Sequence, residues 1–168
     1  GILRNLIIRT NQIGEVMIVL SISEPISEQI SELFIELKNR FSNIVSAYYA
    51  INMKKNDSWF GLECCKVFGN EYLLEKMEHV TFQIGPKSFF QTNTLQSIKL
   101  YQLIRSFAEL SGQEIVYDLY CGVGSIGIFL AKDAKLIIGI EEIPEAVLDA
   151  ECNAKINNIN NAQFYAGD

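Results

Sequence analysis

Residues 118–127 read DLYCGVGSIG and carry a G-x-G-x-x-G pattern at Gly122, Gly124 and Gly127. An apolar stretch, 114–119, precedes the loop, and a helical pattern follows it through Ala131. Glycine has no side chain to block a close approach, so such a loop brings backbone near a ligand or a neighbouring helix. The pattern is weak by itself, because it serves several classes of nucleotide-binding enzyme.

The sequence on either side of this loop predicts a parallel sheet. Strands are expected at 114–119, 136–140 and 163–166, and a helix that starts at Pro144 and closes at 157–158 separates the last two. Strand, helix, strand, helix, strand with apolar strands indicates a right-handed, nucleotide-binding α/β half-fold. A further helix precedes it, capped by Asn93 or Thr94 and stopped at Gly112. Its apolar face should carry Leu95, Ile98, Tyr101, Ile104, Phe107 and Ala108.

The first half, residues 1–84, has a different rhythm and predicts a small α+β domain. Strands are expected at 6–9, 16–22, 44–51, 73–77 and 80–84, with turns at 11–14 and 54–57. Pro25 stands where a first helical residue would, ahead of an apolar stripe that runs to Phe41. We therefore expect one helix on an antiparallel sheet, followed by a second domain over 85–168.

Composition narrows the class of protein. The 168 residues are 49% hydrophobic and 20% charged, with a net charge of −6. No apolar run approaches the ~20 residues that cross a bilayer, and the first residues resemble a strand and not a signal peptide. The four cysteines show no C-x-x-C spacing, which favours free thiols in a reducing cytoplasm and argues against a metal site. The chain looks like a piece of a longer protein, and its negative charge opposes a strong grip on RNA by this piece alone.

Three acids stand at the ends of the three predicted strands of the second half. Asp118 would repel a pyrophosphate but suits the sulfonium and ammonium groups of S-adenosylmethionine. Glu141, 19 residues after Gly122, can accept hydrogen bonds from ribose hydroxyls, and Asp168 can accept from an adenine amino group. Carboxyl ends of parallel strands line one crevice, so we expect the three acids to lie together.

Several segments resemble the RNA 5-methyluridine (uracil-5-)-methyltransferases that act on ribosomal or transfer RNA. They are SFFQTN at 88–93, VYDLYCGVGSIG at 116–127, GIE at 139–141 with PEAV at 144–147, and FYAGD at 164–168. LRN at 3–5 and GEVM at 14–17 resemble the family's central domain less specifically. The resemblance implies a Rossmann-like class I methyltransferase sheet, present in its N-terminal part, that binds S-adenosyl-L-methionine.

Site residues follow from the resemblance position by position. It implies cofactor contacts for Gln91, Tyr120, Ser125, Glu141 and Asp168, with Gly122 and Gly124 forming the loop beneath the cofactor. Tyr120 could instead be a core aromatic, and Gln91 a polar cap at the helix start near Asn93.

The resemblance also implies the chemistry. A cysteine thiolate adds to C6 of an unstacked uridine, C5 takes the methyl group, and a base removes the C5 proton. In the family this cysteine lies beyond the position of Asp168, so no catalytic residue is expected in this chain, which alone should be inactive. Cys121 is rejected as a substitute because it lies in the cofactor loop. RNA, with 23S ribosomal RNA preferred over transfer RNA, would bind through the full-length protein.

Two other classes stay open at this point. The glycine pattern is compatible with an NAD-dependent oxidoreductase, which would bind NADH in preference to S-adenosylhomocysteine. A non-catalytic, RNA-associated module is the other alternative.

Overall fold

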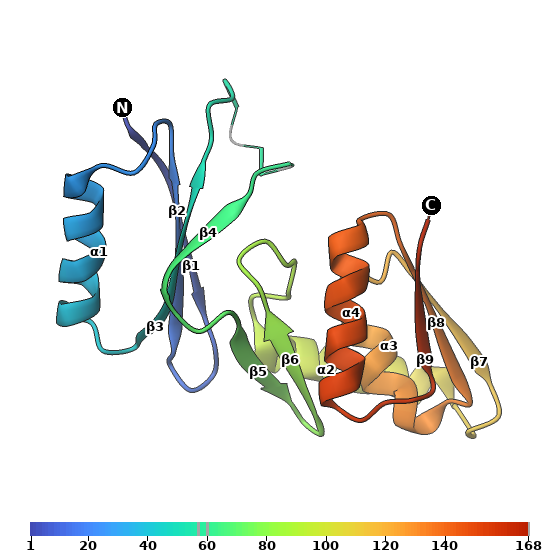
Figure 1. Ribbon diagram of the computed structural model, residues 1–168. Coiled ribbons are helices and arrows are strands. Elements are labelled where there is room, and N and C mark those ends of the chain that lie inside the picture. Colours follow the sequence, from blue (N-terminus) through green and yellow to red (C-terminus); the bar gives the residue numbers. More distant parts are fainter. Residues whose placement is uncertain (57, 60, 168) are drawn as a thin grey trace. The chain divides into compact units, whose positions relative to one another are not determined.

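The computed structural model describes all residues except Asp57, Phe60 and Asp168. The chain divides into two compact units (Figure 1). The first holds residues 1–73 with 85–87, and the second holds residues 74–84 with 88–168. Within the described residues, no helix is long and apolar enough to span a membrane.

The first unit is a four-stranded sheet with one helix on it. The strands are β1 (Leu3–Thr10), β2 (Val16–Ile22), β3 (Ile44–Ile51) and β4 (Cys64–Gly69), in the order β1-β2-β3-β4, and the helix is α1 (Glu28–Arg40). Ile30 and Phe34 of α1 are buried against Ile18, Leu20, Ile22 and Ala47 of the sheet. Burial of this apolar layer supplies the favourable free energy that a small α+β unit needs to fold.

Three features of the first unit correct the sequence interpretation. The sheet is mixed and not antiparallel, because α1 carries the chain across it and β3 pairs with β2 in parallel. Strand β4 was not predicted. Helix α1 begins at Glu28 and not at Pro25, because the Ser27 hydroxyl accepts from the Ile30 N–H and caps the helix.

The second unit begins with a hairpin and ends in a parallel sheet. Strand β5 (Leu73–Met77) pairs with β6 (Val80–Ile84), and helix α2 (Thr94–Ala108) follows. The remaining elements are β7 (Ile115–Leu119), α3 (Ser125–Leu130), the short 3-10 helix η1 (Ala131–Asp133), β8 (Leu136–Glu141), α4 (Pro144–Ile156) and β9 (Ala162–Ala166). The sheet order is β7-β8-β9 with both pairings parallel, as the sequence predicted.

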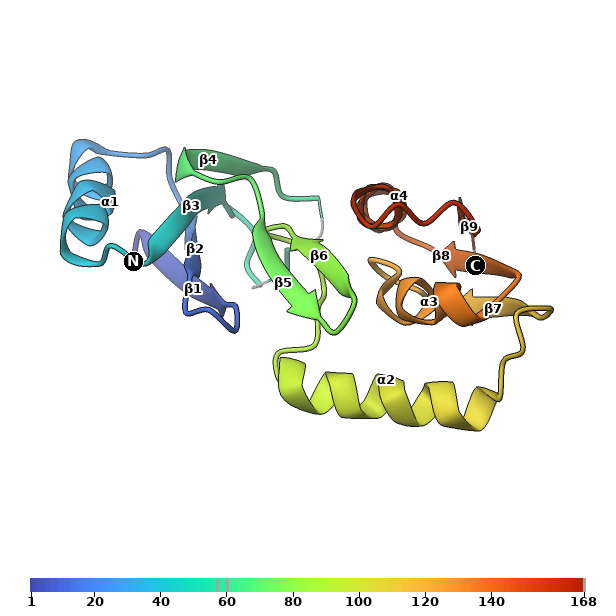
Figure 2. The ribbon, with the colours of Figure 1, turned by 90° about the horizontal axis from the view of Figure 1, so that it is seen from below.

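Helices α3 and α4 cover one face of this sheet, and α2 runs beside α3 (Figure 2). The hairpin belongs to this unit, since β6 packs against α3 and α4. The sequence interpretation had placed the hairpin in a first domain that ended at residue 84. Asn93 caps α2 and Pro144 opens α4, as predicted.

Two exposed apolar faces differ from the sequence prediction. Strand β7 was expected to be buried, yet Ile115, Tyr117 and Leu119 are 51%, 62% and 60% exposed. Helix α2 buries Thr94, Ser97 and Tyr101, and leaves Leu95 and Phe107 exposed. It ends at Ala108, before Gly112, because Glu109 takes a left-handed conformation.

We predict that Gly124→Ala destabilises the protein by about 2–4 kcal/mol. Gly124 has a φ of +75°, and an added Cβ would lie 2.9 Å from the Phe164 ring and 3.0 Å from the Ala150 methyl. The matched control is Gly112→Ala, whose φ of +87° is as unfavourable but whose Cβ would meet open space. Equilibrium unfolding in urea measures both variants, and equal losses would show that close packing at Gly124 contributes nothing.

Candidate functional site

A sharp turn, Tyr120–Gly124, carries the chain from the end of β7 into α3. Tyr120, Gly122 and Gly124 all have positive φ, at 58°, 56° and 75°. The turn is anchored where the Cys121 N–H donates to the Ile140 carbonyl at 3.0 Å. We call these five residues the glycine turn.

Tyr120 is the unusual member of the glycine turn. A left-handed conformation costs a residue with a side chain about 1–2 kcal/mol, and such strain concentrates at functional positions. The Tyr120 side chain is 80% exposed, so the alternative that it is a core aromatic is wrong. An exposed aromatic ring therefore lies at the carboxyl end of β7, on a residue whose backbone conformation is unfavourable.

Asp118 caps helix α3, which follows the glycine turn. Gly124 is the N-cap of α3 and has no side chain, so it cannot cap the helix. The Asp118 carboxylate takes over this role, since its Oδ2 accepts from the Gly127 N–H at 2.8 Å. Burial raises the pKa of Asp118, and the hydrogen bond from Gly127 opposes that shift. Gly127 must be glycine here, because a Cβ would lie 2.7 Å from Ile137 and 3.0 Å from Asp118.

Glu141 holds the glycine turn from the neighbouring strand. Its Oε2 accepts from the Gly122 N–H and its Oε1 accepts from the Ile143 N–H, both at 2.9 Å. The residue is only 9% exposed. A carboxylate has about four lone-pair sites, so both oxygens keep capacity for one further donor each. Glu141 thus fixes the turn and remains able to accept from a ligand.

Ser125 opens α3 and is bonded to α2. Its hydroxyl lies 2.8 Å from the Tyr101 hydroxyl, and Tyr101 is 2% exposed. Burial raises the pKa of Tyr101, which keeps the phenol neutral. Sequence reasoning had assigned Tyr101 only to an apolar face. The sequence offered one signal of this bond: the apolar stripe of the helix carries a tyrosine, whose hydroxyl needs a hydrogen-bond partner when it is buried.

Gln91 is exposed and precedes the start of α2. The alternative role considered for it, a helix cap, belongs to Asn93, whose side chain accepts from the Gln96 N–H at 3.1 Å. The same segment is fixed at Ser88, whose hydroxyl donates to the Asp149 carboxylate at 2.6 Å. Phe89, between Ser88 and Gln91, is 74% exposed.

The structure brings most predicted site residues to one place. Tyr120, Gly122 and Gly124 belong to the glycine turn, and Glu141 accepts a hydrogen bond from it. Ser125 begins α3, and Asp118 accepts a hydrogen bond from the first turn of that helix. Asp168 lies outside the described residues, although β9 ends beside β8 where Ala166 pairs with Glu141.

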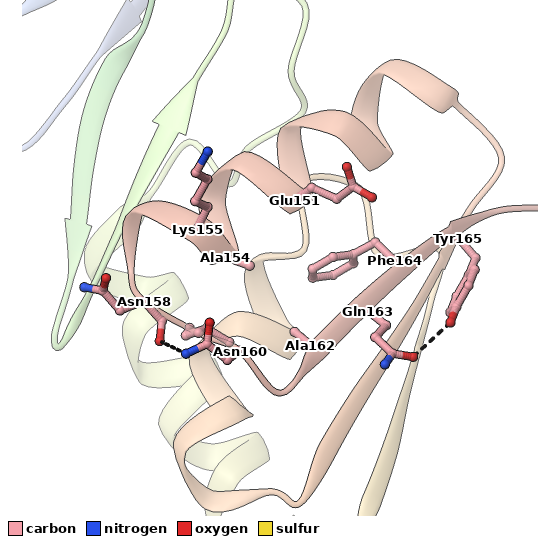
Figure 3. A pocket seen from close by; sticks show the side chains of 10 residues that line it. Glu151, Ala154, Lys155, Asn158, Asn160, Ala162, Gln163, Phe164 and Tyr165 are labelled. Carbon is pink, nitrogen blue, oxygen red and sulfur yellow. Dashed lines mark hydrogen bonds between the residues drawn. The ribbon is translucent and has the colours of Figure 1, made fainter.

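A separate hollow of about 540 Å³ lies between α4 and β9 (Figure 3). Polar side chains of Glu151, Lys155 and Gln163 line it together with Phe164, and the Tyr165 hydroxyl donates to Gln163 at 2.9 Å. None of the predicted site residues that the structure describes lines it. The glycine turn, and not this hollow, therefore defines the candidate site.

Cys121 sits inside the glycine turn, but its thiol is chemically quiet. It is 7% exposed, and burial together with the Asp118 and Glu141 carboxylates raises its pKa to about 12. At pH 8 the thiolate, which is the reactive form, then makes up about one part in ten thousand. This environment opposes any role for Cys121 as a nucleophile.

We predict that Cys121 is alkylated by iodoacetamide at pH 8 at least 100-fold more slowly than Cys152, which is exposed on α4. Peptide mass spectrometry of native protein over a time course measures both rates in one sample. Unfolding in guanidinium should abolish the difference. Fast labelling of Cys121 in the native protein would contradict the burial argument and restore it as a candidate nucleophile.

The chain is similar to several known RNA methyltransferases. An RNA methyltransferase of Bacteroides thetaiotaomicron is 46% identical over the whole chain, and one of Enterococcus faecalis is 41% identical over 99% of it. The chain spans 38% and 37% of these two relatives. The tRNA (uracil-54, C5)-methyltransferase of Pyrococcus abyssi, solved with S-adenosyl-L-homocysteine, matches all of the chain at 30% identity and a TM-score of 0.82, and the match covers 40% of that enzyme.

The fold prediction is thereby confirmed as the Rossmann-like sheet of class I methyltransferases. The family model for tRNA (uracil-5-)-methyltransferases matches residues 13–166, which include most of both units and the whole glycine turn. The chain belongs to the tRNA (uracil-5-)-methyltransferase family.

Proposed function

We propose that the protein is an S-adenosylmethionine-dependent methyltransferase that acts on C5 of a uridine in RNA, and that the glycine turn holds the cofactor. The observation that carries the proposal is the glycine turn itself, with its strained, exposed Tyr120 and its two supporting carboxylates. Membership of the family and the ligand of the Pyrococcus abyssi enzyme support the same assignment.

The residues of the turn fit this cofactor chemically. Glu141 has acceptor capacity left for the two ribose hydroxyls. An added Cβ at Gly122 would meet nothing within 4 Å, so open space lies next to its backbone. The Asp118 and Glu141 carboxylates make the local potential negative, which suits a cation and disfavours a pyrophosphate. The same charges argue against the NAD-dependent alternative.

The bound cofactor would supply an activated methyl group on a positively charged sulfur. The chain's own residues would bind and orient it: Glu141 at the ribose, Tyr120 as an aromatic cover, and Ser125, Gln91 and Asp168 as further polar contacts. We place Asp118 behind the turn, where it stabilises α3 and contributes negative potential. Ser125 is oriented by Tyr101, which fixes its hydroxyl.

The proposed reaction requires a thiolate that adds to C6 of uracil, which makes C5 nucleophilic. Cys121 is unsuited to this step, given a pKa of about 12. Because the nucleophilic cysteine of the family lies beyond the position of Asp168, we propose that it lies outside residues 1–168 in this protein as well. The longer chains of the relatives, of which this chain spans 38%, are consistent with that placement.

The first test is tritium release from RNA labelled with ³H at uracil C5. We expect the complete gene product to release tritium only with S-adenosylmethionine, and residues 1–168 alone to release none. Parallel assays with 23S ribosomal RNA and with transfer RNA transcripts identify the substrate, for which we expect ribosomal RNA. Transfer of methyl label without tritium release would contradict C5 as the target. Preferential binding of NADH over S-adenosylhomocysteine would contradict the cofactor.

We also predict that Glu141→Ala weakens S-adenosylhomocysteine binding by ~1–3 kcal/mol, or roughly 5–150-fold in Kd, because charged hydrogen bonds to the ribose are lost. Calorimetry on the complete gene product measures the Kd. The matched control is Glu142→Ala, which removes the exposed carboxylate next in sequence and should leave the Kd within about twofold. Equal Kd values for the two variants would remove Glu141 from the site.

A further inference from the structure

Helix α4 presents one polar side chain per turn to the segment Thr81–Ser88. Asp149 and Asn153 belong to α4 and Asn157 is its C-cap; the three are spaced four residues apart, so their side chains point to one side of the helix. They bond to Ser88, Gln83 and Thr81 respectively. The side chains on this face form hydrogen bonds with the backbone of β6, as the backbone of a neighbouring strand would.

The bonds to β6 show why these residues are amides. Among the described residues, strand β6 pairs with β5 alone, so the backbone groups on its other edge need partners from outside the sheet. The Asn157 carboxamide accepts from the Thr81 N–H at 2.8 Å and donates to the Thr81 carbonyl at 2.6 Å. The Asn153 Oδ1 accepts from the Gln83 N–H at 2.7 Å. An amide carries both a donor and an acceptor, which a hydrophobic residue or a carboxylate does not.

Asn153 differs from Asn157 in what its second end contacts. Its Nδ2 donates to the carbonyl of Val123, at 3.3 Å, in the middle of the glycine turn. Asn157 instead donates to Thr81 and to the Asn153 carbonyl and does not reach the turn. Asn153 is 0% exposed, so no water competes for these bonds. Its neighbour Ala150 packs at the same place, 3.0 Å from the position of a Cβ on Gly124.

We infer that Asn153 is a positioning residue for the cofactor, acting through the Val123 carbonyl. The inference rests on the proposed function, because it assumes that the glycine turn holds S-adenosylmethionine. One carboxamide fixes the turn to β6, and the same face of α4 fixes Ser88, three residues before Gln91. Asn153 thereby positions the backbone of the glycine turn relative to the segment that contains Gln91, which is another of the proposed cofactor contacts.

The test compares Asn153→Asp with Asn157→Asp in the complete gene product. Each variant keeps an acceptor for β6 and loses one donor, but only Asn153→Asp loses the bond to the glycine turn. We expect Asn153→Asp to raise the Kd for S-adenosylhomocysteine at least tenfold and Asn157→Asp to change it less than threefold. Asn153→Ser, which is neutral, serves as a second variant because a buried carboxylate at 153 can prevent folding.

All binding and kinetic assays are run at a temperature where thermal unfolding shows each variant fully folded. We also expect the KM for S-adenosylmethionine to rise in the Asn153 variants while the KM for RNA stays within twofold. Equal changes in Kd for the 153 and 157 variants would overturn the positioning role and leave the proposed function standing. A wild-type protein that does not bind S-adenosylhomocysteine would overturn both.

Discussion

The second unit depends on holding one unfavourable turn in place. Three of five consecutive residues, Tyr120, Gly122 and Gly124, have left-handed backbone conformations, and one of them is not glycine. Such a turn does not persist unless its surroundings over-determine it. Its N–H groups and carbonyls are bonded on three sides: Gly122 to Glu141, Cys121 to Ile140, and Val123 to Asn153.

Both acids of the candidate site accept hydrogen bonds from the protein's own backbone, Asp118 from Gly127 and Glu141 from Gly122 and Ile143. Burial raises the pKa of Asp118, so the folded protein retains a proton at pH values where the unfolded chain has lost it. Asp118 therefore favours folding at low pH, and this contribution is lost as the pH rises through the folded-state pKa. At neutral pH the buried charge costs stability. A neutral asparagine could also accept from Gly127, so the hydrogen bond alone does not require a carboxylate. We propose that the negative charge of Asp118 favours a cationic cofactor.

Regular periodicity made much of the fold predictable. The order β7-α3-β8-α4-β9 follows from apolar strands and from local signals such as Pro144 and Asn93, which act within a few residues. The errors concern interactions between distant residues. The parallel pairing of β2 with β3 depends on where α1 carries the chain, and the exposure of Ile115, Tyr117 and Leu119 depends on which face the helices cover.

The candidate site divides in the same way. Glycine spacing and acids at strand ends predicted Gly122, Gly124 and Glu141. A glycine pattern indicates a close approach of the backbone, and acids at the carboxyl ends of parallel strands lie in one crevice. Tyr101 and Asn153 carry no such signal, since a tyrosine on a helix stripe and an asparagine in mid-helix have many ordinary roles. Only the contacts, Tyr101 with Ser125 and Asn153 with Val123, connect them to the glycine turn.

The distribution of charge bears on how RNA is bound. The sequence of the first unit carries eight basic and eight acidic residues, whereas that of the second carries six basic and twelve acidic. The net charge of −6 thus belongs entirely to the unit with the glycine turn. Phosphate binding needs basic groups, so this unit is poorly suited to hold an RNA backbone but well suited to hold a cation. We therefore propose that the second unit binds the cofactor and that the affinity for RNA arises outside this unit.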